Sequence, residues 1–408
     1  MANLVLHIGT KKTGTTFLQR YLAANVSQLN KAGWTYPEYL GNVNHLELAL
    51  PFEKKVSDAH LRWSMADPDS KARRAEASAA RLAERVQPGQ RWIMTSEFFS
   101  SRLQSPDEVQ DAVDFLRRFF DQITVVVFFR RQEFTFPSIY SQTVKDGYRP
   151  FWSRDFCEKH LAELDYDAMY RRWSSAVGPE NMRAMPYLES HKRDAAHFLQ
   201  QFGAATGIEF GPDWVTPAES NVNRSLSAEG ITFLRVINPY VPRVKPDGSS
   251  NHSQRQRVIA KVMELTSGPD FNPGPEVIDF VTEYYKSSNA DLLARLPQDE
   301  SWNEWQRQSG HSLKPTKEAA DIRAGRVAEL LVALSEPGGP MAWSRMDRAS
   351  MLTMYVTERG ARRVGFHRLP LIRQMHLSQR ISEWLANRPA GRGLPWRERR
   401  ALPRKRQG

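Results

Sequence analysis

Several features common in secreted, membrane and metal-binding proteins are missing from this chain or scarce in it. It has one cysteine, Cys157, among 408 residues, which excludes intrachain disulfides and favours a reducing compartment. No apolar run is long enough to span a bilayer, and a strand expected from Asn3 leaves no room for a signal peptide. The histidines form neither an H-x-x-x-H pattern nor a cluster with cysteine, so a zinc site is not expected. These absences predict a cytoplasmic protein.

The N-terminal segment has the pattern of a strand, a glycine loop and a helix. Residues 5–8 read as a short buried strand, residues 9–16 are GTKKTGTT, and apolar residues at helical spacing follow. In this arrangement backbone N–H groups and a helix N-terminus converge on a phosphate. The loop that binds nucleoside triphosphates has its lysine after the second glycine, whereas here Gly14 is followed by Thr15 and the lysines precede it. The loop therefore predicts phosphate binding without triphosphate hydrolysis.

A second segment supports this interpretation. Residues 123–129 are all apolar, β-branched or aromatic, as in a strand buried on both faces of a parallel sheet. A comparable strand of P-loop NTPases often ends in an aspartate that helps to hold magnesium, but this one ends in Arg130 and Arg131. Arginine and the later Ser138 suit a phosphate monoester. Arg130 could instead form a salt bridge at the strand end, and Arg131 competes with it for this role, but the spacing of eight residues to Ser138 selects Arg130. Ser138 could simply be a helix cap.

These motifs resemble those of a known family. Residues 12–16, KTGTT, resemble the 5′-phosphosulfate loop of sulfotransferases that use 3′-phosphoadenylyl sulfate (PAPS). Arg130 with Ser138 resembles the family's 3′-phosphate motif. The order His7-Ile8-Gly9, the KTGTT loop and then Leu18-Gln19 is closest to bacterial members that act on carbohydrates or small molecules. The resemblance covers about the first 300 residues and is specific because two short motifs occur together in the right order.

The resemblance implies a role for each residue of the donor site. Lys12 would offset the charge that develops on the leaving phosphate, and no metal is needed if these donors carry that charge. Many members of the family close over the 3′-phosphoadenosine with a basic loop late in the chain. Arg224 is the candidate for this loop, although Ser225 could simply cap a helix there. The donor-binding residues expected on this basis are Lys11, Lys12, Thr13, Gly14, Thr15, Thr16, Arg130, Ser138 and Arg224.

Two residues compete as the base that takes the acceptor's proton. Residues 91–96 read as a buried strand that ends at Glu97, and ligands of open α/β sheets bind at such strand ends. The resembled family uses a glutamate or a histidine, depending on the branch. Glu97 is the first choice, and His45, which could also be a capping or solvated histidine, is the rival. His7 lies inside the first strand and is interpreted as a core histidine.

The chain alternates strand-like and helix-like segments. Helices are expected at 71–86 and 106–120, and a further strand at 181–187. This alternation predicts an α/β fold, a P-loop NTPase-like parallel sheet with helices on both faces, joined to a mostly helical, basic C-terminal extension. The expected domains are a sulfotransferase domain (1–305), a linker with a helix (306–340) and the extension (341–408).

The charge of the chain is uneven. Residues 341–408 contain 16 Lys and Arg but 4 Asp and Glu, while the rest is close to neutral, so the net charge of +11 comes from this segment. Such a tail either binds an anionic polymer or an anionic membrane surface, or is a solvated extension. Nothing resembles a defined nucleic-acid module, and DNA or RNA is not expected as a partner.

Together these features predict a PAPS-dependent sulfotransferase. It would move a sulfuryl group to a hydroxyl or amine of a carbohydrate, a lipid headgroup or a small molecule, leaving 3′-phosphoadenosine 5′-phosphate (PAP). It would act in the cytoplasm or peripherally at the inner membrane surface. One alternative is a nucleotide-dependent kinase, which requires a magnesium-binding aspartate that the sequence does not place. The other is a non-catalytic protein that binds nucleotides or anionic polymers.

Overall fold

The computed structural model describes residues 2–41, 43–56, 65, 67–148, 152–217, 225–244, 250–309, 324–335, 340–341, 348 and 351–352. The predicted Arg224 and nearly all of the basic extension lie outside these residues. The chain divides into two compact units, unit 1 (Met1–Ile231 with Thr266–Glu318) and unit 2 (Thr232–Leu265 with Ala319–Gly408). The domain boundaries proposed above at 305 and 340 stay predictions.

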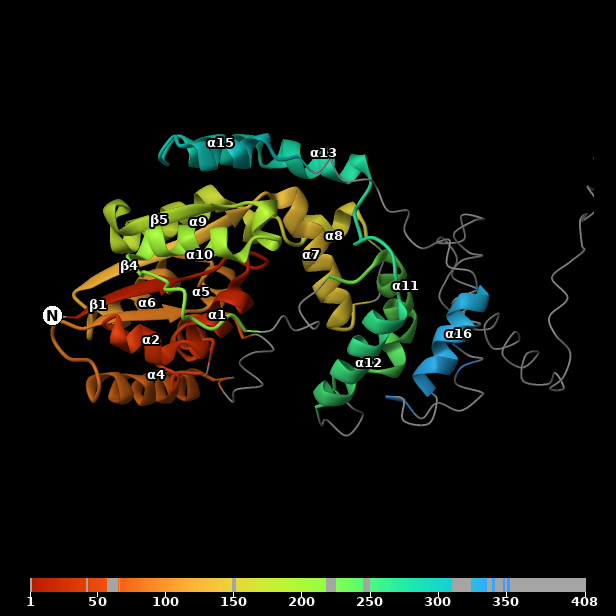
Figure 1. Cartoon of the computed structure of the whole chain (residues 1–408), viewed down its shortest axis with the longest axis horizontal. Coiled ribbons are helices and arrows are strands. Elements are labelled where there is room, and N and C mark those ends of the chain that lie inside the picture. The colour runs from red at the N-terminus through yellow and green to blue at the C-terminus, as the bar shows by residue number, and fades with distance from the viewer. Residues whose placement is uncertain are drawn as a thin grey trace, which may run out of the picture. The chain divides into compact units, whose positions relative to one another are not determined.

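Unit 1 is built on a five-stranded parallel sheet, which confirms the predicted α/β fold (Figure 1). Its strand order is β2-β3-β1-β4-β5, and all neighbouring strands pair in parallel. The strands are β1 (Asn3–His7), β2 (Trp34–Thr35), β3 (Arg91–Thr95), β4 (Gln122–Arg130) and β5 (Met182–Tyr187). Because all strands run the same way, the loops after β1, β3, β4 and β5 emerge at one edge, where ligands of such sheets bind.

Helices cover both faces of the sheet, because successive side chains of a strand point to opposite faces. On one face Val5 and Phe128 pack in a buried cluster with residues of α1 (Thr15–Ala24), α2 (Val26–Lys31) and α10 (Ala195–Thr206). On the other face Phe129 stacks on Tyr166 of α9 (Tyr166–Val177) with ring centroids 4.6 Å apart. The apolar run of β4 is thus buried from both sides, as its composition predicts.

The start of a helix is set by local capping. The helix expected at 106–120 is α6 (Pro106–Arg117), which begins where Ser105 and Glu108 form a capping box. The helix expected at 71–86 is α4 (Pro68–Ala83), capped in the same way by Asp67. The remaining helices of unit 1 are α5 (Phe98–Arg102), α7 (Gln132–Lys145), α8 (Arg154–Glu158), α13 (Pro275–Tyr284), α14 (Lys286–Leu293) and α15 (Glu300–Arg307). The division between the units falls within α11 (Ala228–Ile237).

Unit 2 is helical where the structure describes it. The C-terminal part of α11 is followed by α12 (His252–Leu265), and α16 (Ala324–Ser335) lies within the segment 306–340, where a helix is expected. Val258 and Val262 of α12 are buried, and Arg326 of α16 donates to the Leu265 carbonyl at 2.8 Å. The two helices therefore pack on each other through an apolar stripe.

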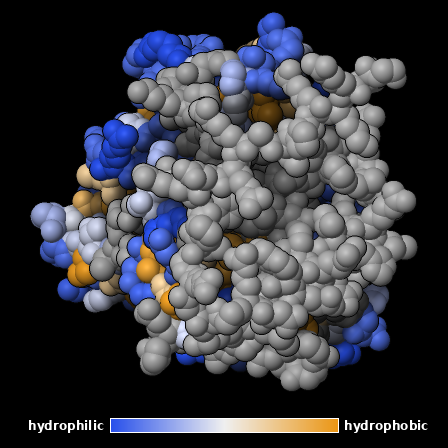
Figure 2. Space-filling model, turned by 90° about the vertical axis from the view of Figure 1, so that its right-hand side faces the viewer, coloured by the Kyte–Doolittle hydropathy of each residue, from blue (hydrophilic) through white to orange (hydrophobic). Residues whose placement is uncertain are grey.

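Figure 2 shows one face of the molecule, on which the coloured residues are mostly hydrophilic, with small hydrophobic groups between them. In the described part of the chain no helix is both long enough and apolar enough to cross a membrane. The large apolar side chains that are exposed among these residues are Val43, Val56, Val215, Val244, Tyr284 and Val332.

Candidate functional site

The loop between β1 and α1 is held against β4 by the backbone. The Thr10 amide and hydroxyl both donate to the Phe128 carbonyl, at 3.2 and 3.0 Å, and the buried Thr13 hydroxyl donates to the Thr10 carbonyl at 2.6 Å. Gly14 adopts a left-handed conformation (φ 73°) as the N-cap of α1 and has no side chain to cap the first turn. Thr15 and Thr16 occupy that turn. Its backbone N–H groups are thus arranged for an anion, as the motif predicts.

The two lysines of the loop have different partners. Lys11 pairs with Glu163 at 2.6 Å. Burial alone would raise the pKa of Glu163, but His160 and Lys11 outweigh it and lower that pKa to about 2. Lys12 instead donates to the Gln142 side chain at 3.2 Å. Lys11 therefore contacts the short helix η3 (Ala162–Leu164), whereas Lys12 contacts α7.

Positive charge is concentrated around Lys12. Burial, and then the neighbouring Lys145, Lys11 and Arg130, lower the pKa of Lys12 to about 8, against the opposite effect of Asp146. Burial also lowers the pKa of Lys145 to about 8, against the opposite effects of Asp146 and Asp270. Several cations close to a buried lysine form a site that favours an anionic ligand.

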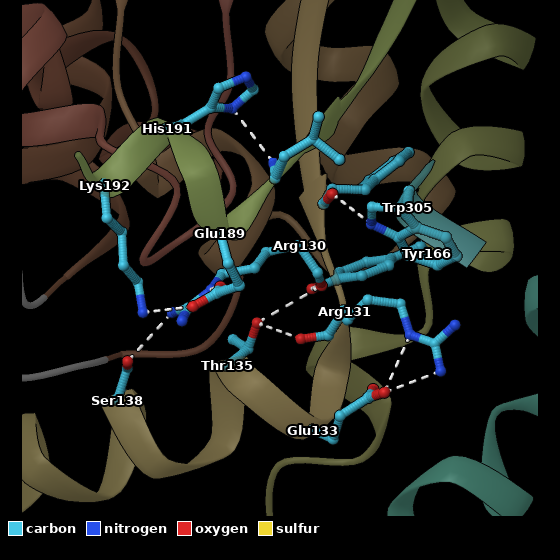
Figure 3. Close-up of polar contacts among 12 residues, drawn as sticks. Arg130, Arg131, Glu133, Thr135, Ser138, Tyr166, Glu189, His191, Lys192 and Trp305 are labelled. Carbon is cyan, nitrogen blue, oxygen red and sulfur yellow. Dashed lines mark hydrogen bonds and ion pairs between the residues drawn. The ribbon is translucent and has the colours of Figure 1, made fainter. Parts of the chain in front are cut away.

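The predicted arginine and serine lie together after β4 (Figure 3). Arg130 is the last residue of β4 and is 2% exposed. Its Nη1 donates to the Ser138 hydroxyl of α7 at 3.1 Å. Arg131, the competing arginine, is held by Glu133 at 2.8 Å and stacks on Trp305. The arginine nearer to Ser138 is therefore Arg130, as the eight-residue spacing predicts.

Glu97 lies beside the loop at the C-terminal end of β3. Its Oε2 accepts hydrogen bonds from Gln19 of α1 at 2.9 Å and from Asn44 at 3.1 Å. Gly9 makes this approach possible, because a Cβ there would lie 3.3 Å from Glu97 and its φ is +109°. Two amide donors therefore fix the carboxylate beside the glycine loop.

The structure gives the two histidines roles in packing. His45 is fully buried; its Nδ1 accepts from the Thr95 amide at 2.9 Å and its Nε2 donates to the Pro37 carbonyl at 3.0 Å. Burial lowers its pKa to about 4. With both ring nitrogens engaged by the backbone, His45 is poorly placed to accept a substrate proton. His7 is also fully buried, bonds Thr95 at 2.7 Å and has a pKa that burial lowers to about 3.

A cavity of about 260 Å³ opens beside Arg130. It is lined by charged, hydroxyl and apolar residues from segments that are far apart in the sequence. They include Arg130, Phe134, Ser138, Ser141, Glu189, Lys192, Ser225, Leu226, Asp270 and Phe271. Arginine and serine thus face a hollow that is large enough for part of a ligand.

Sequence reasoning did not assign several polar and charged residues to this region. Gln142 and Lys145 follow Ser138 at positions i+4 and i+7 of α7, so helical spacing could have placed all three on one face. Glu189 comes just after β5, and polar residues beyond a parallel strand were a usable signal. The partnership of Lys11 with Glu163 joins segments that no local pattern connects.

Comparisons with known proteins give only distant similarities. No family model and no curated protein matches the chain. Among solved structures, a sulfotransferase from Alicyclobacillus acidocaldarius is 17% identical with a TM-score of 0.43, over 75% of this chain and 99% of that one. The sulfotransferase domain of the curacin biosynthetic pathway is 13% identical with a TM-score of 0.32, over 54% and 79%. That of the Synechococcus PCC 7002 olefin synthase is 13% identical with a TM-score of 0.30, over 66% and 96%. These identities and TM-scores are too low to assign a function to this chain.

Proposed function

We propose that this protein is a PAPS-dependent sulfotransferase. The observation that carries the proposal is the juxtaposition of two cationic elements at neighbouring strand ends. The glycine loop after β1 supplies Lys12, and the end of β4 supplies Arg130 with Ser138, close enough for Arg130 to lower the pKa of Lys12. PAPS carries phosphate at both the 5′ and the 3′ position, and two separate cationic elements match such a donor.

The residues of the site suit the chemistry of sulfuryl transfer. When bound, PAPS would supply the sulfuryl group, with PAP as the leaving group. The first turn of α1 and Lys12 would hold the 5′-phosphate and offset its developing charge, while Arg130 and Ser138 would hold the 3′-phosphate. Glu97 would take the proton of the acceptor hydroxyl or amine as the new bond to sulfur forms and the bond to the leaving phosphate breaks. In a magnesium-dependent kinase an aspartate is expected where Arg130 stands.

The acceptor and location belong to the same proposal. We propose a hydroxyl or amine of a carbohydrate, a lipid headgroup or a small molecule as the acceptor, in the bacterial cytoplasm or at the inner membrane surface. The chemistry of Glu97 is compatible with each of these acceptors.

The first experiment is calorimetric titration of the full chain with PAP, beside ATP with magnesium. Metal-independent binding of PAP is expected, and Lys12→Ala and Arg130→Ala should each weaken it about tenfold or more, since each removes a charged hydrogen bond. Lys286→Ala, which removes an exposed lysine of α14, is the matched control and should leave binding unchanged. Binding of ATP with magnesium but not of PAP would overturn the proposal in favour of a kinase.

Glu97→Ala then separates a catalyst from a protein that only binds nucleotides. Loss of a general base lowers turnover on the order of 100-fold or more, whereas PAP affinity should stay within about twofold because Glu97 is not among the residues proposed to hold either phosphate. Turnover can be followed as PAP release with a panel of acceptors. Full turnover in this variant would remove Glu97 from the role of base.

A further inference from the structure

A short 3-10 helix brings a carboxylate and an ammonium group to Arg130. β4 and β5 are adjacent and parallel, with Arg130 paired to Tyr187. The chain leaves β5 at Tyr187 and forms η5 (Glu189–Lys192) at once. Residues three positions apart lie on one side of such a turn, so Glu189 and Lys192 come to the end of β4 together.

Glu189 bridges two cations (Figure 3). Its Oε1 accepts from Arg130 Nε at 2.6 Å, and its Oε2 pairs with Lys192 Nζ at 2.5 Å. The carboxylate thus binds the Nε side of the guanidinium, while Nη1 is directed to Ser138. Held in this way, Arg130 keeps its terminal nitrogens for the cavity and loses little side-chain entropy when an anion binds.

Charge in this cluster is arranged for an added anion. Burial alone would raise the pKa of Glu189, but Arg130 and Lys192 outweigh it and keep that pKa below its usual value. Partial burial, and then Arg130, lower the pKa of Lys192. Asp270 also lines the cavity. Without Lys192, the single positive charge of Arg130 would stand beside the two negative charges of Glu189 and Asp270. Lys192 adds a second positive charge, which a bound phosphate requires.

Lys192 is also accessible to a ligand. Its side chain is 45% exposed, against 3% for that of Arg130, and both line the same cavity as the hydroxyl groups of Ser138 and Ser225. A guanidinium, an ammonium and hydroxyl groups around one hollow are the donors that a phosphate monoester takes in proteins.

We propose that Lys192 is a further phosphate-binding residue of this site, and that Glu189 is the positioning residue that orients Lys192 and Arg130 toward a 3′-phosphate. This inference rests on the proposed function. It adds two residues to the donor site and assigns the cavity beside Arg130 to the phosphomonoester end of the donor.

An ordinary surface ion pair provides the matched control. Glu283 and Lys286 of unit 1 have the same spacing and order, but lie 3.3 Å apart with side chains 76% and 74% exposed. Such a pair contributes little to stability. Removing it is therefore expected to affect neither folding nor nucleotide binding.

The test compares PAP with AMP, which lacks the 3′-phosphate, by calorimetry on the full chain. The ratio of the dissociation constant of AMP to that of PAP measures what the 3′-phosphate contributes to binding. Lys192→Ala should reduce this ratio about tenfold, as expected for one charged hydrogen bond, and Lys192→Arg should restore most of it. Glu189→Gln should reduce the ratio while leaving AMP binding within about twofold. Lys286→Ala should change neither nucleotide.

The outcomes separate the two proposals. Suppose that the wild-type protein binds PAP and that Arg130→Ala lowers the ratio, whereas Lys192→Ala does not. The inference is then wrong and the proposed function stands. If Lys192→Ala or Glu189→Gln weakens PAP and AMP equally, with a lower melting temperature, the residue acts through the fold and the inference is again wrong. If the wild-type protein binds no PAP, the proposed function fails and the inference fails with it.

Discussion

At the scale of single residues, Lys12 makes the site sensitive to pH. Its pKa is lowered to about 8 by burial and by nearby Lys145, Lys11 and Arg130, and the form that binds a phosphate is the protonated one. The phosphate groups of PAP are already ionised at pH 7, since their second pKa is about 6. The affinity for PAP should therefore fall as the pH rises through 8 to 9.5, well below the usual pKa of lysine.

Calorimetry at pH 7 and 9.5 checks this prediction, with Lys12→Arg as the control. Arginine stays charged over the whole range, so the variant should lose less affinity than the wild-type protein. Part of the pH dependence should remain, because the pKa of Lys145 is also lowered to about 8. An affinity that stays constant up to pH 9.5 in the wild-type protein would contradict a binding role for the lysine ammonium groups.

At the scale of elements, the sequence predicts those parts whose pattern is local. The apolar run 123–129 predicts β4, and the glycine loop predicts the start of α1, because strand burial and helix capping depend on neighbouring residues. The two-residue β2 is too short for a pattern. The bridge from Arg130 to Glu189 spans β4 and β5, so its partners are 59 residues apart and are joined only by sheet order. Contacts between residues this far apart cannot be predicted from local sequence patterns.

The loop before α1 also yields a prediction about an element. Gly14→Ala places a methyl group in a left-handed backbone (φ +73°), 3.4 Å from Phe198 and 3.5 Å from Tyr187. Gly89→Ala is the matched control, since φ is +83° there and no atom lies within 4 Å. Both variants should lose about 1 kcal/mol of unfolding free energy from the backbone, because the methyl group at position 14 would make only ordinary van der Waals contacts. Denaturant unfolding checks that the two losses are similar, and PAP affinity should fall only in Gly14→Ala, where the methyl group alters the loop that is proposed to hold the 5′-phosphate. Similar losses with unchanged PAP affinity would contradict this proposed role of the loop.

At the scale of the whole molecule, charge and the donor site are separated along the sequence. The residues proposed for the donor site and for the base lie between Lys11 and Arg224, whereas the positive excess lies in residues 341–408. A chain that is close to neutral over residues 1–340 and strongly basic at one end can bind an anionic surface without using the site. We propose that this tail binds anionic lipid and so brings the enzyme to membrane-borne acceptors.

Sedimentation of the full chain with vesicles tests this role of the tail. Binding to vesicles that contain phosphatidylglycerol is expected at 50 mM salt and should be lost at 500 mM, since exposed charges are screened within about one Debye length. Each Lys or Arg near an anionic bilayer contributes about 1 kcal/mol, so replacing the six cations between 397 and 406 by glutamine should weaken binding at least tenfold. The same variant should bind PAP as the wild-type protein does, which shows that the fold is intact. Binding to phosphatidylcholine vesicles, or binding that salt does not reduce, would contradict an electrostatic role, because neither depends on the charge of the tail.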